Sequence, residues 1–478
     1  MKKVFKILKK IAFGILYLIG FIFITLLCAV LFSKKDYGTP DSLIGEQIQS
    51  IAIKNVNVIS MDKNKDTIQS NMTVLIDKGI ISQVIPDSIQ IPNNYKIKEG
   101  NGRYLIPGLI DMHAHIFDRS DLPMYLSYGV TTVRNMMGFP MHLRWKKQVL
   151  DNKYQGARLI TSSPTINSGE GGDPFHKNIS SAREAIEAIK EYKANGYDFI
   201  KIYDGITKDQ YLAIMQEAAN QDMYVAGHPP HTISLDTLIK HNLNSIEHIE
   251  EIIQGPLKYK LDTVKGREIA KKLKAKNMRV TATLSAYYAI YRTTINGQEY
   301  IDNRPQELIN PFVRFIGKKQ LSEWVDPSEG YYKWNTKKYE CMASLVKIFH
   351  EEGVELLLGT DTGPNLTVPG LTVHEEILLL KGLGLSPLSI LQSGTMKAAN
   401  ALGMANEIGS ITVGKKAEFV LLNENPLKNL STLMKPQSIV SNGIWYDDNA
   451  IMALKNLGKD KSNTFMTLGR FIDHAINK

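Results

Sequence analysis

Residues 105–115 read Leu-Ile-Pro-Gly-Leu-Ile-Asp-Met-His-Ala-His, an apolar run that ends in a pair of histidines. Side chains at positions i and i+2 of a β-strand point to the same face. His113 and His115 are therefore expected on one face where the strand ends, and two neutral imidazoles in that arrangement suit a borderline metal such as zinc. Such a pair alone is a weak signal, so its meaning depends on the rest of the chain.

Four more potential ligands follow, each at the end of a short apolar run: Lys201, His228, His248 and Asp361. Such runs are typical of strands buried on both faces in parallel α/β sheets. Taken singly, each residue has a simpler interpretation, as a core histidine, an edge lysine or a loop-capping aspartate. Because six such residues, the two histidines included, occur at the ends of five different strands, a shared metal site is the better hypothesis.

Helical segments alternate with these runs, and two of them begin with capping boxes, at Ser181 to Glu184 and at Thr207 to Gln210. Eight strands with intervening helices predict an α/β fold of the TIM (β/α)8 barrel type, in which active sites lie at the C-terminal ends of the strands. The expected strands are near Ile110 and at 130–136, 158–162, 199–203, 224–227, 245–248, 279–284 and 355–359.

From about residue 47 to 450 the chain resembles the amidohydrolase superfamily. Residues 105–115 are similar to that family's first barrel strand, Gly359-Thr360-Asp361 to its eighth, and residues 409–422 to its return into a small β-sandwich. The strands around Lys201 and His248 are most similar to the branch that contains prolidase-like dipeptidases and imidazolonepropionases. The resemblance implies a barrel together with a β-sandwich built from both flanks.

The resemblance also implies a binuclear metal centre. A lysine at the fourth strand is carboxylated by carbon dioxide and bridges two divalent metals, most often zinc. Carried over by position, His113, His115 and Asp361 hold one metal, His228 and His248 the other, and carboxylated Lys201 both. The chemistry agrees, since an ammonium has no lone pair to donate, whereas burial lowers a lysine pKa and frees the amine.

The expected activity is hydrolysis of a C–N bond, in a dipeptide or an N-acyl amino acid, by attack of a metal-bridging hydroxide, with Asp361 as the catalytic proton acceptor. A lactone, ester or organophosphate hydrolase is the first alternative. A mononuclear deaminase, which would not need Lys201, is the second, and a non-catalytic scaffold is the third.

Two further residues are candidate substrate contacts. Tyr203 follows Lys201 by two positions and is expected on the same face of the strand, while His231 follows His228 after two prolines. Arg134 on the second strand is interpreted as a structural ion-pair partner. An insertion at about 285–345, rich in tyrosine and tryptophan, is expected at the catalytic face, either as a lid or binding element or as inserted helices whose aromatic residues only pack together.

The amino terminus predicts a transmembrane helix. Five lysines precede an uncharged apolar run of 22 residues, Ile11 to Phe32, and two lysines follow it. This run is long enough to span a bilayer and is longer than the apolar part of a typical signal peptide. The lysine asymmetry favours a cytoplasmic amino terminus, so the catalytic domain would lie in the periplasm or the extracellular space. Secretion after signal cleavage is the alternative.

The anchor accounts for most of the basic charge. Residues 1–35 contain seven lysines and no acid, so the formal charge of +9 leaves 50 basic and 48 acidic residues elsewhere. The basic pI therefore gives no argument for nucleic-acid binding. The expected partners are a small-molecule substrate and the membrane, and the oligomeric state is left open.

The expected organisation has five parts. They are an anchor or signal at 1–35, a linker at 36–46, a β-sandwich from 47–107 and 405–452, a hydrolase barrel at 108–404, and a C-terminal tail at 453–478.

Overall fold

The computed structural model describes residues 2–40, 42–62, 67–169 and 175–478. Eight parallel strands form its centre and pair in one cyclic order. Ladders connect β6 to β8 and β11 to β15, and the parallel bridges Ser162 to Phe199 and Ala114 to Thr362 join the two groups at both edges. This is the strand order of a (β/α)8 barrel. The strands are β6 (Leu109–Ala114), β7 (Val130–Asn135), β8 (Arg158–Thr161), β11 (Ile200–Ile202), β12 (Val225–Gly227), β13 (Ser245–Glu247), β14 (Arg279–Thr281) and β15 (Glu355–Leu357).

The helices follow the strands as the sequence predicts. The Ser181 side chain accepts from the Glu184 N–H and begins α4, and Thr207 and Gln210 form a capping box at α5. Both predicted helix starts are therefore confirmed. The barrel helices are α2 (Asp121–Ser127), α3 (Pro140–Leu150), α4 (Ala182–Asn195), α5 (Lys208–Asn220), α6 (Leu235–Lys240), α7 (Glu250–Gln254), α8 (Thr263–Ala275), α13 (Leu371–Gly382), α14 (Pro387–Ser393) and α15 (Met396–Ala401).

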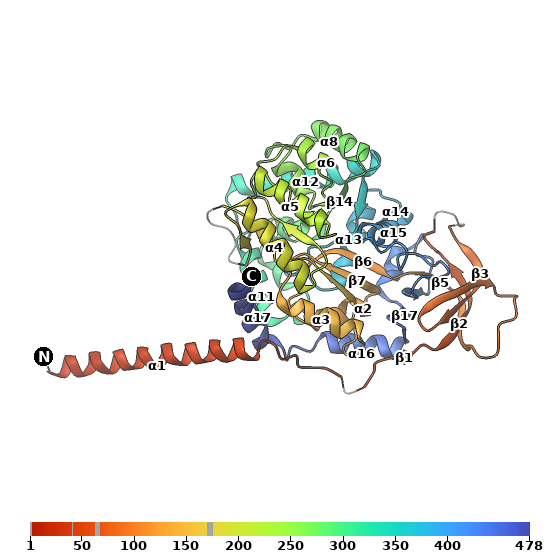
Figure 1. Cartoon of the computed structure of the whole chain (residues 1–478), viewed down its shortest axis with the longest axis horizontal. Helices are drawn as coiled ribbons and strands as arrows, with labels where there is room; N and C mark the ends of the chain where they lie inside the picture. The colour runs from red at the N-terminus through yellow and green to blue at the C-terminus, as the bar shows by residue number, and fades with distance from the viewer. Residues whose placement is uncertain (1, 41, 63–66, 170–174) are drawn as a thin grey trace.

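The segment between β14 and β15 is helical. It consists of α9 (Leu284–Asn296), α10 (Gln298–Asp302), the short turn η1 (Gln306–Leu308), α11 (Pro311–Ser322) and α12 (Glu329–Glu351). This segment contains the insertion expected at about 285–345. Its α11 packs next to the C-terminal helix of the chain (Figure 1).

Strands from both flanks of the barrel form one eight-stranded sheet, in the order β1-β18-β17-β16-β5-β2-β3-β4. The sequence predicts a two-sheet sandwich, whereas these strands belong to a single sheet. That sheet folds back so that β4 contacts residues 414–417, and it thereby encloses a small apolar core. Its strands are β1 (Glu46–Gln47), β2 (Ser50–Val58), β3 (Gln69–Asp77), β4 (Ile80–Pro86), β5 (Lys96–Pro107), β16 (Phe419–Leu422), β17 (Ser438–Ser441) and β18 (Ile444–Tyr446).

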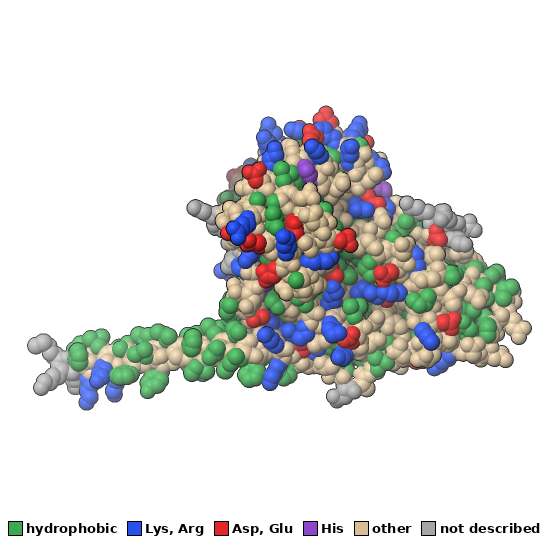
Figure 2. Space-filling view, in the orientation of Figure 1, with side chains coloured by type: hydrophobic (Ala, Val, Ile, Leu, Met, Phe, Trp, Pro, Cys, Tyr) green, Lys and Arg blue, Asp and Glu red, His purple; other side chains and the backbone are tan. Residues whose placement is uncertain are grey.

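The N-terminal helix α1 (Lys2–Phe32) projects away from the body (Figure 1). Its residues Val4–Phe32 have a mean hydropathy of 2.9 in their most apolar stretch, and only 6% of that stretch is buried. Apolar side chains cover its surface, with lysines near the free end (Figure 2). By length and composition this helix is able to cross a membrane, as an anchor or as a signal sequence.

The C-terminal segment, expected as a tail of unassigned role, forms α16 (Asp448–Gly458) and α17 (Thr464–Asn477). Helix α17 packs against the end of α1 that joins the body. A Cβ atom at position 469 would lie only 1.9 Å from the Ala29 carbonyl oxygen. Because glycine has no Cβ, α17 can approach α1 this closely. The base of α1 and the C-terminal helix therefore meet at one place on the body.

Asp36 is the ionic centre of this junction. Its carboxylate accepts from Arg144 Nε (2.8 Å), Trp145 Nε1 (2.9 Å) and Arg470 Nη2 (2.8 Å). Burial raises the pKa of Asp36, but the hydrogen bonds and charges of these partners outweigh it and lower the pKa to about 2. The ionised carboxylate therefore stabilises the folded chain.

We expect Asp36→Asn to lower the free energy of unfolding at pH 7 by about 3 kcal/mol, because it leaves a buried arginine without its counter-ion. Since the folded pKa is depressed, the stabilisation is complete above about pH 4 and is lost as the pH falls through about 2. Thermal unfolding of the unmodified chain and of the variant across this pH range measures the difference in their free energies of unfolding. The matched control is Asp151→Asn, which removes a surface pair with Lys147 and is expected to cost less than about 1 kcal/mol. Equal losses in the two variants would contradict this account.

Candidate metal centre

The end of β6 and the segment after β15 bring three potential ligands together. The Asp361 N–H donates to the His113 carbonyl oxygen at 2.7 Å, which holds this segment against β6. Asp361 Oδ1 lies 2.9 Å from His115 Nε2 and 3.4 Å from His113 Nε2. Ligand atoms of these three residues all lie within 4.8 Å of one another, so one cation could contact all three.

The two other histidines adjoin this group. The ring centroid of His248 lies 4.4 Å from that of His113 and 4.7 Å from that of His228. Burial, followed by the charges of neighbouring groups, holds the pKa of His113, His228 and His248 well below the usual value. These imidazoles are therefore neutral, which is the form that binds metals.

Lys201 lies within the cluster, on β11. Its Nζ is buried and makes no hydrogen bond to any described residue. Burial is the main influence on its pKa and lowers it to about 8, although Glu247 and Asp361 act in the opposite direction. A buried amine with no acceptor is costly as an ammonium ion. A pKa near 8 leaves a fraction of the amine uncharged at neutral pH, and the uncharged amine is the form that could be converted into an anionic ligand.

A second layer of polar groups fixes the imidazoles. His113 Nδ1 lies 2.8 Å from Glu247 Oε2, His248 Nδ1 2.7 Å from Thr283 Oγ1, and His228 Nδ1 2.9 Å from Glu251 Oε1. Because Nδ1 of each of these three rings is paired with an oxygen, Nε2 is the atom that is left to coordinate a metal. Histidine ligands of metals are commonly oriented by such partners.

Glu247 is itself held in place. Arg134 Nη2 donates to its Oε1 at 2.6 Å, and Ser245 Oγ donates to the same oxygen. Arg134 and Glu247 are both fully buried. The interpretation of Arg134 as an ion-pair partner is therefore confirmed, and its partner orients a candidate ligand.

We expect Glu247→Gln to weaken metal binding about 10- to 100-fold, because His113 loses the anion that orients its ring. Competition with a chelator measures the affinity. Glu250→Gln is the matched control: this neighbouring carboxylate accepts from Lys338 at 2.6 Å and does not contact a candidate ligand. Unchanged affinity in a folded Glu247→Gln protein would exclude this role for Glu247.

The backbone is strained at the cluster. His248 has φ of 65°, Asp361 of 57° and Thr283 of 50°, all in the left-handed region that side chains disfavour. Such conformations persist only where the surrounding structure enforces them, and they concentrate at functional sites.

The two candidate substrate contacts lie beside the cluster. The ring of Tyr203 stacks on His228, with centroids 4.1 Å apart, and its contact with substrate stays a prediction. His231 Nε2 lies 3.0 Å from Glu251 Oε2, so Glu251 connects His228 to His231. This arrangement favours a positioning role for His231.

Sequence reasoning did not identify the residues that support the ligands, namely Glu247, Glu251 and Thr283. Each lies close in sequence or on an adjacent strand to a predicted ligand, but its partner atom is fixed only by the folded barrel. Buried acidic residues at 247 and 251, next to a candidate ligand, were the available signal.

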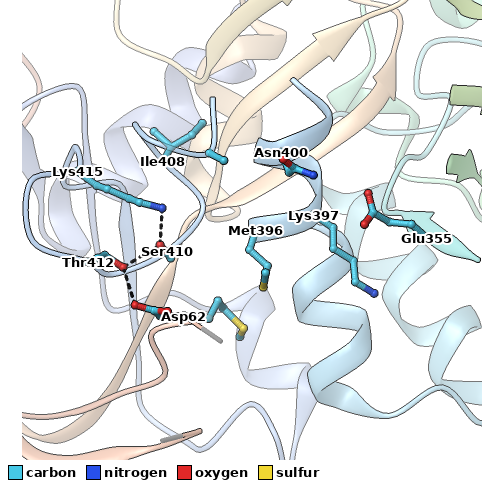
Figure 3. Close-up of a pocket in the computed structure, with 11 residues that line it drawn as sticks. Asp62, Glu355, Met396, Lys397, Asn400, Ile408, Ser410, Thr412 and Lys415 are labelled. Atoms are coloured by element: carbon cyan, nitrogen blue, oxygen red, sulfur yellow. Dashed lines mark hydrogen bonds between the residues drawn. The ribbon is translucent and has the colours of Figure 1, made fainter. Parts of the chain in front are cut away.

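A cavity of about 470 Å³ lies at the other end of the barrel (Figure 3). Glu355, which lines it, begins β15, whereas Asp361 follows the end of that strand. Three of its polar side chains bond to one another: Lys415 Nζ donates to Ser410 Oγ at 2.7 Å, and Thr412 Oγ1 lies 3.0 Å from the same hydroxyl. This cavity is therefore separate from the candidate metal centre.

The sequence profile of the amidohydrolase family matches residues 104–445. A 5′-deoxyadenosine deaminase of Methanococcus aeolicus is 26% identical over 381 residues, which are 74% of this chain and 82% of that protein. The structure of a bottromycin amidohydrolase has a TM-score of 0.71 at 21% identity, with 91% of this chain and 93% of that chain covered. A Xaa-Pro dipeptidase structure has a TM-score of 0.65 at 19% identity, with 84% and 100% covered.

This chain belongs to the amidohydrolase family. It is an enzyme that hydrolyses carbon–nitrogen bonds. The family generally binds divalent metals, and the His113, His115 and Asp361 group is a candidate metal site. The structural neighbours share the barrel with an additional domain, as the sequence predicts.

Proposed function

We propose that this chain is a binuclear hydrolase that cleaves the amide bond of an N-acyl amino acid or a dipeptide. The observation that carries the proposal is the buried Lys201 amine, which makes no hydrogen bond to a described residue and lies among imidazoles and a carboxylate. Carbon dioxide would convert this amine into an anionic carbamate, which removes the unpaired cation and supplies oxygen ligands.

The donor set fits two divalent cations, most readily zinc. His113, His115 and Asp361 would hold one cation, His228 and His248 the other, and carboxylated Lys201 both. Two bound cations supply a nucleophile at neutral pH and polarise the scissile carbonyl.

The residues of the chain have the remaining roles. The Asp361 carboxylate lies next to His113 and His115. Burial raises its pKa, but the interactions with His248 and His115, including the hydrogen bond from His115, outweigh burial and lower the pKa. It would accept a proton from the attacking group and transfer it to the leaving nitrogen. Glu247, Glu251 and Thr283 would hold the imidazoles in position and leave each Nε2 free to coordinate.

The second candidate is a mononuclear deaminase, favoured by the likeness to a 5′-deoxyadenosine deaminase. Both reactions break a C–N bond by addition of water, but they act on different substrates and release different products. One panel of substrates therefore distinguishes them. The purified full chain is loaded with zinc in bicarbonate buffer. It is then presented with N-acyl amino acids, Xaa-Pro dipeptides, lactones and adenosine derivatives. Amide hydrolysis supports the proposal, and ammonia release from an adenosine derivative alone would reject it.

We further propose that α1 anchors the enzyme, with the catalytic body outside the cytoplasm. The five lysines before the apolar run support this orientation. Protease treatment of intact cells that express the chain tests it. Digestion of the body without lysis is the expected result, and protection would place the body inside.

A further inference from the structure

A cavity of about 230 Å³ opens beside His115. Its walls are apolar: Phe117, Met137, Phe175, Val313, Ile316 and Phe471 line it. Among its described lining side chains, only His115 and Gln320 are polar. Binding sites for a whole small ligand commonly measure about 300–1,000 Å³, so this cavity has the size of a subsite for one group.

The cavity is continuous with the candidate metal centre. His115 belongs to both, and Gly363 and Pro364, which also line the cavity, follow Asp361 by two and three positions. The ring of Phe117 stacks on that of His115, with centroids 6.0 Å apart. A group bound here would therefore lie directly beside His115 and the candidate metal centre.

Helix α17 closes the cavity with Phe471, which lies at the centre of an aromatic cluster. Its ring centroid lies 5.1 Å from those of Phe117 and Phe175, and 5.4 Å from that of Phe312. His474 on the same helix is buried, and its Nε2 lies 2.7 Å from the Phe175 carbonyl oxygen. The wall is thus packed and apolar rather than an open surface.

The same helix holds the base of α1. Arg470, next to Phe471, donates to the carbonyl oxygens of Ser33 (3.1 Å) and Lys35 (2.8 Å). On the two helices that supply lining residues, Phe315 of α11 is 69% exposed and Ile476 of α17 is 70% exposed. Figure 1 shows α11 and α17 next to the point where α1 leaves the body. The cavity therefore lies near the place where the chain would enter a lipid bilayer.

We propose that this cavity is an acyl-chain subsite, so that the substrates are N-acyl amino acids with a long aliphatic acyl group. This inference rests on the proposed amide hydrolysis. An uncharged acyl chain gains from burial among these side chains, whereas the ammonium group of a dipeptide would have to be desolvated near apolar walls. The position near α1 favours substrates that partition into a membrane.

The kinetic test compares N-octanoylglycine with N-acetylglycine on the zinc-loaded full chain. We expect the octanoyl compound to have a kcat/KM at least about tenfold higher, because the longer chain buries more apolar surface. Ile316→Arg, at the half-buried wall, should abolish this preference. Phe315→Arg, at the adjacent exposed position of α11, should retain it. Equal kcat/KM for the two compounds in the unmodified enzyme would overturn the proposal.

A binding test separates this inference from the proposed function. Ile316→Cys and Phe315→Cys are made in a Cys28→Ser chain, since the remaining Cys341 is buried and burial raises its thiol pKa. We expect N-octanoylglycine to slow maleimide labelling of Cys at 316 several-fold and to leave labelling at 315 unchanged. Protection without turnover would support the subsite and reject amide hydrolysis. Turnover without protection would reject the subsite alone.

Discussion

Asp361→Asn is expected to lower kcat by about 10³- to 10⁴-fold with little change in KM. The substitution keeps the size of the side chain but removes the charge that faces His113 and His115, and an amide cannot accept the proton that the reaction releases. The rate of hydrolysis of the best substrate from the panel, measured with metal content, tests this.

The control for Asp361→Asn is Asp209→Asn, an exposed carboxylate in the first turn of α5, which should retain full activity. An Asp361→Asn enzyme that keeps more than about a tenth of the original kcat would assign the proton transfer to another group. Loss of bound metal together with activity would place Asp361 among the ligands, and loss of activity with metal retained would isolate its role in proton transfer.

The barrel and the ligand cluster were predictable because both follow local patterns. A run of four to six apolar residues predicts a buried strand, and a polar residue that ends it lies at the face where active sites occur. His228 follows such a run, whereas Lys201 lies within its short strand, and the structure brings both together with His113, His248 and Asp361. Close contact at the seam between β15 and β6 depends on Gly359, where a Cβ atom would lie 3.0 Å from the backbone nitrogen of His113.

The residues that support the ligands were less accessible to prediction because their pairing is not local. Glu247 bonds His113 across 134 positions and Arg134 across 113. Alternation along a strand places Glu247 and His248 on opposite faces, so a ligand at 248 suggests that 247 points away from the site. The left-handed backbone at His248 breaks that alternation, and no pattern in the sequence predicts this backbone conformation.

The flanking sheet and the C-terminal segment differ from the sequence-based expectation for different reasons. The register of strands that are more than 300 positions apart, such as β5 and β16, fixes whether one sheet or two form, and alternation alone does not encode it. For α17 a signal was present: Met466, Phe471 and His474 are buried and lie at spacings that suit one helical face. The lysine content of the last 26 residues obscured that pattern.

Lys201→Ala is the substitution that best separates the two candidate reactions. A binuclear hydrolase that uses carboxylated Lys201 should lose metal, from about two equivalents to about one, and at least about 100-fold in kcat. A mononuclear deaminase should keep about one equivalent and most of its activity. The metal content and the turnover rate, measured on the same preparation with and without bicarbonate, distinguish the two reactions.

Two further variants make the Lys201 result specific. Lys201→Glu returns a carboxylate to the site on a shorter side chain, so it should recover part of the lost metal, whereas Lys201→Met fills the same space without a donor and should not. Lys208→Ala, at the exposed start of α5, controls for the loss of a lysine. If Lys201→Met retained both metal equivalents and full amide hydrolysis, the buried amine would have a packing role only. The hydrolytic centre would then have to be assigned to the four histidines and Asp361 alone.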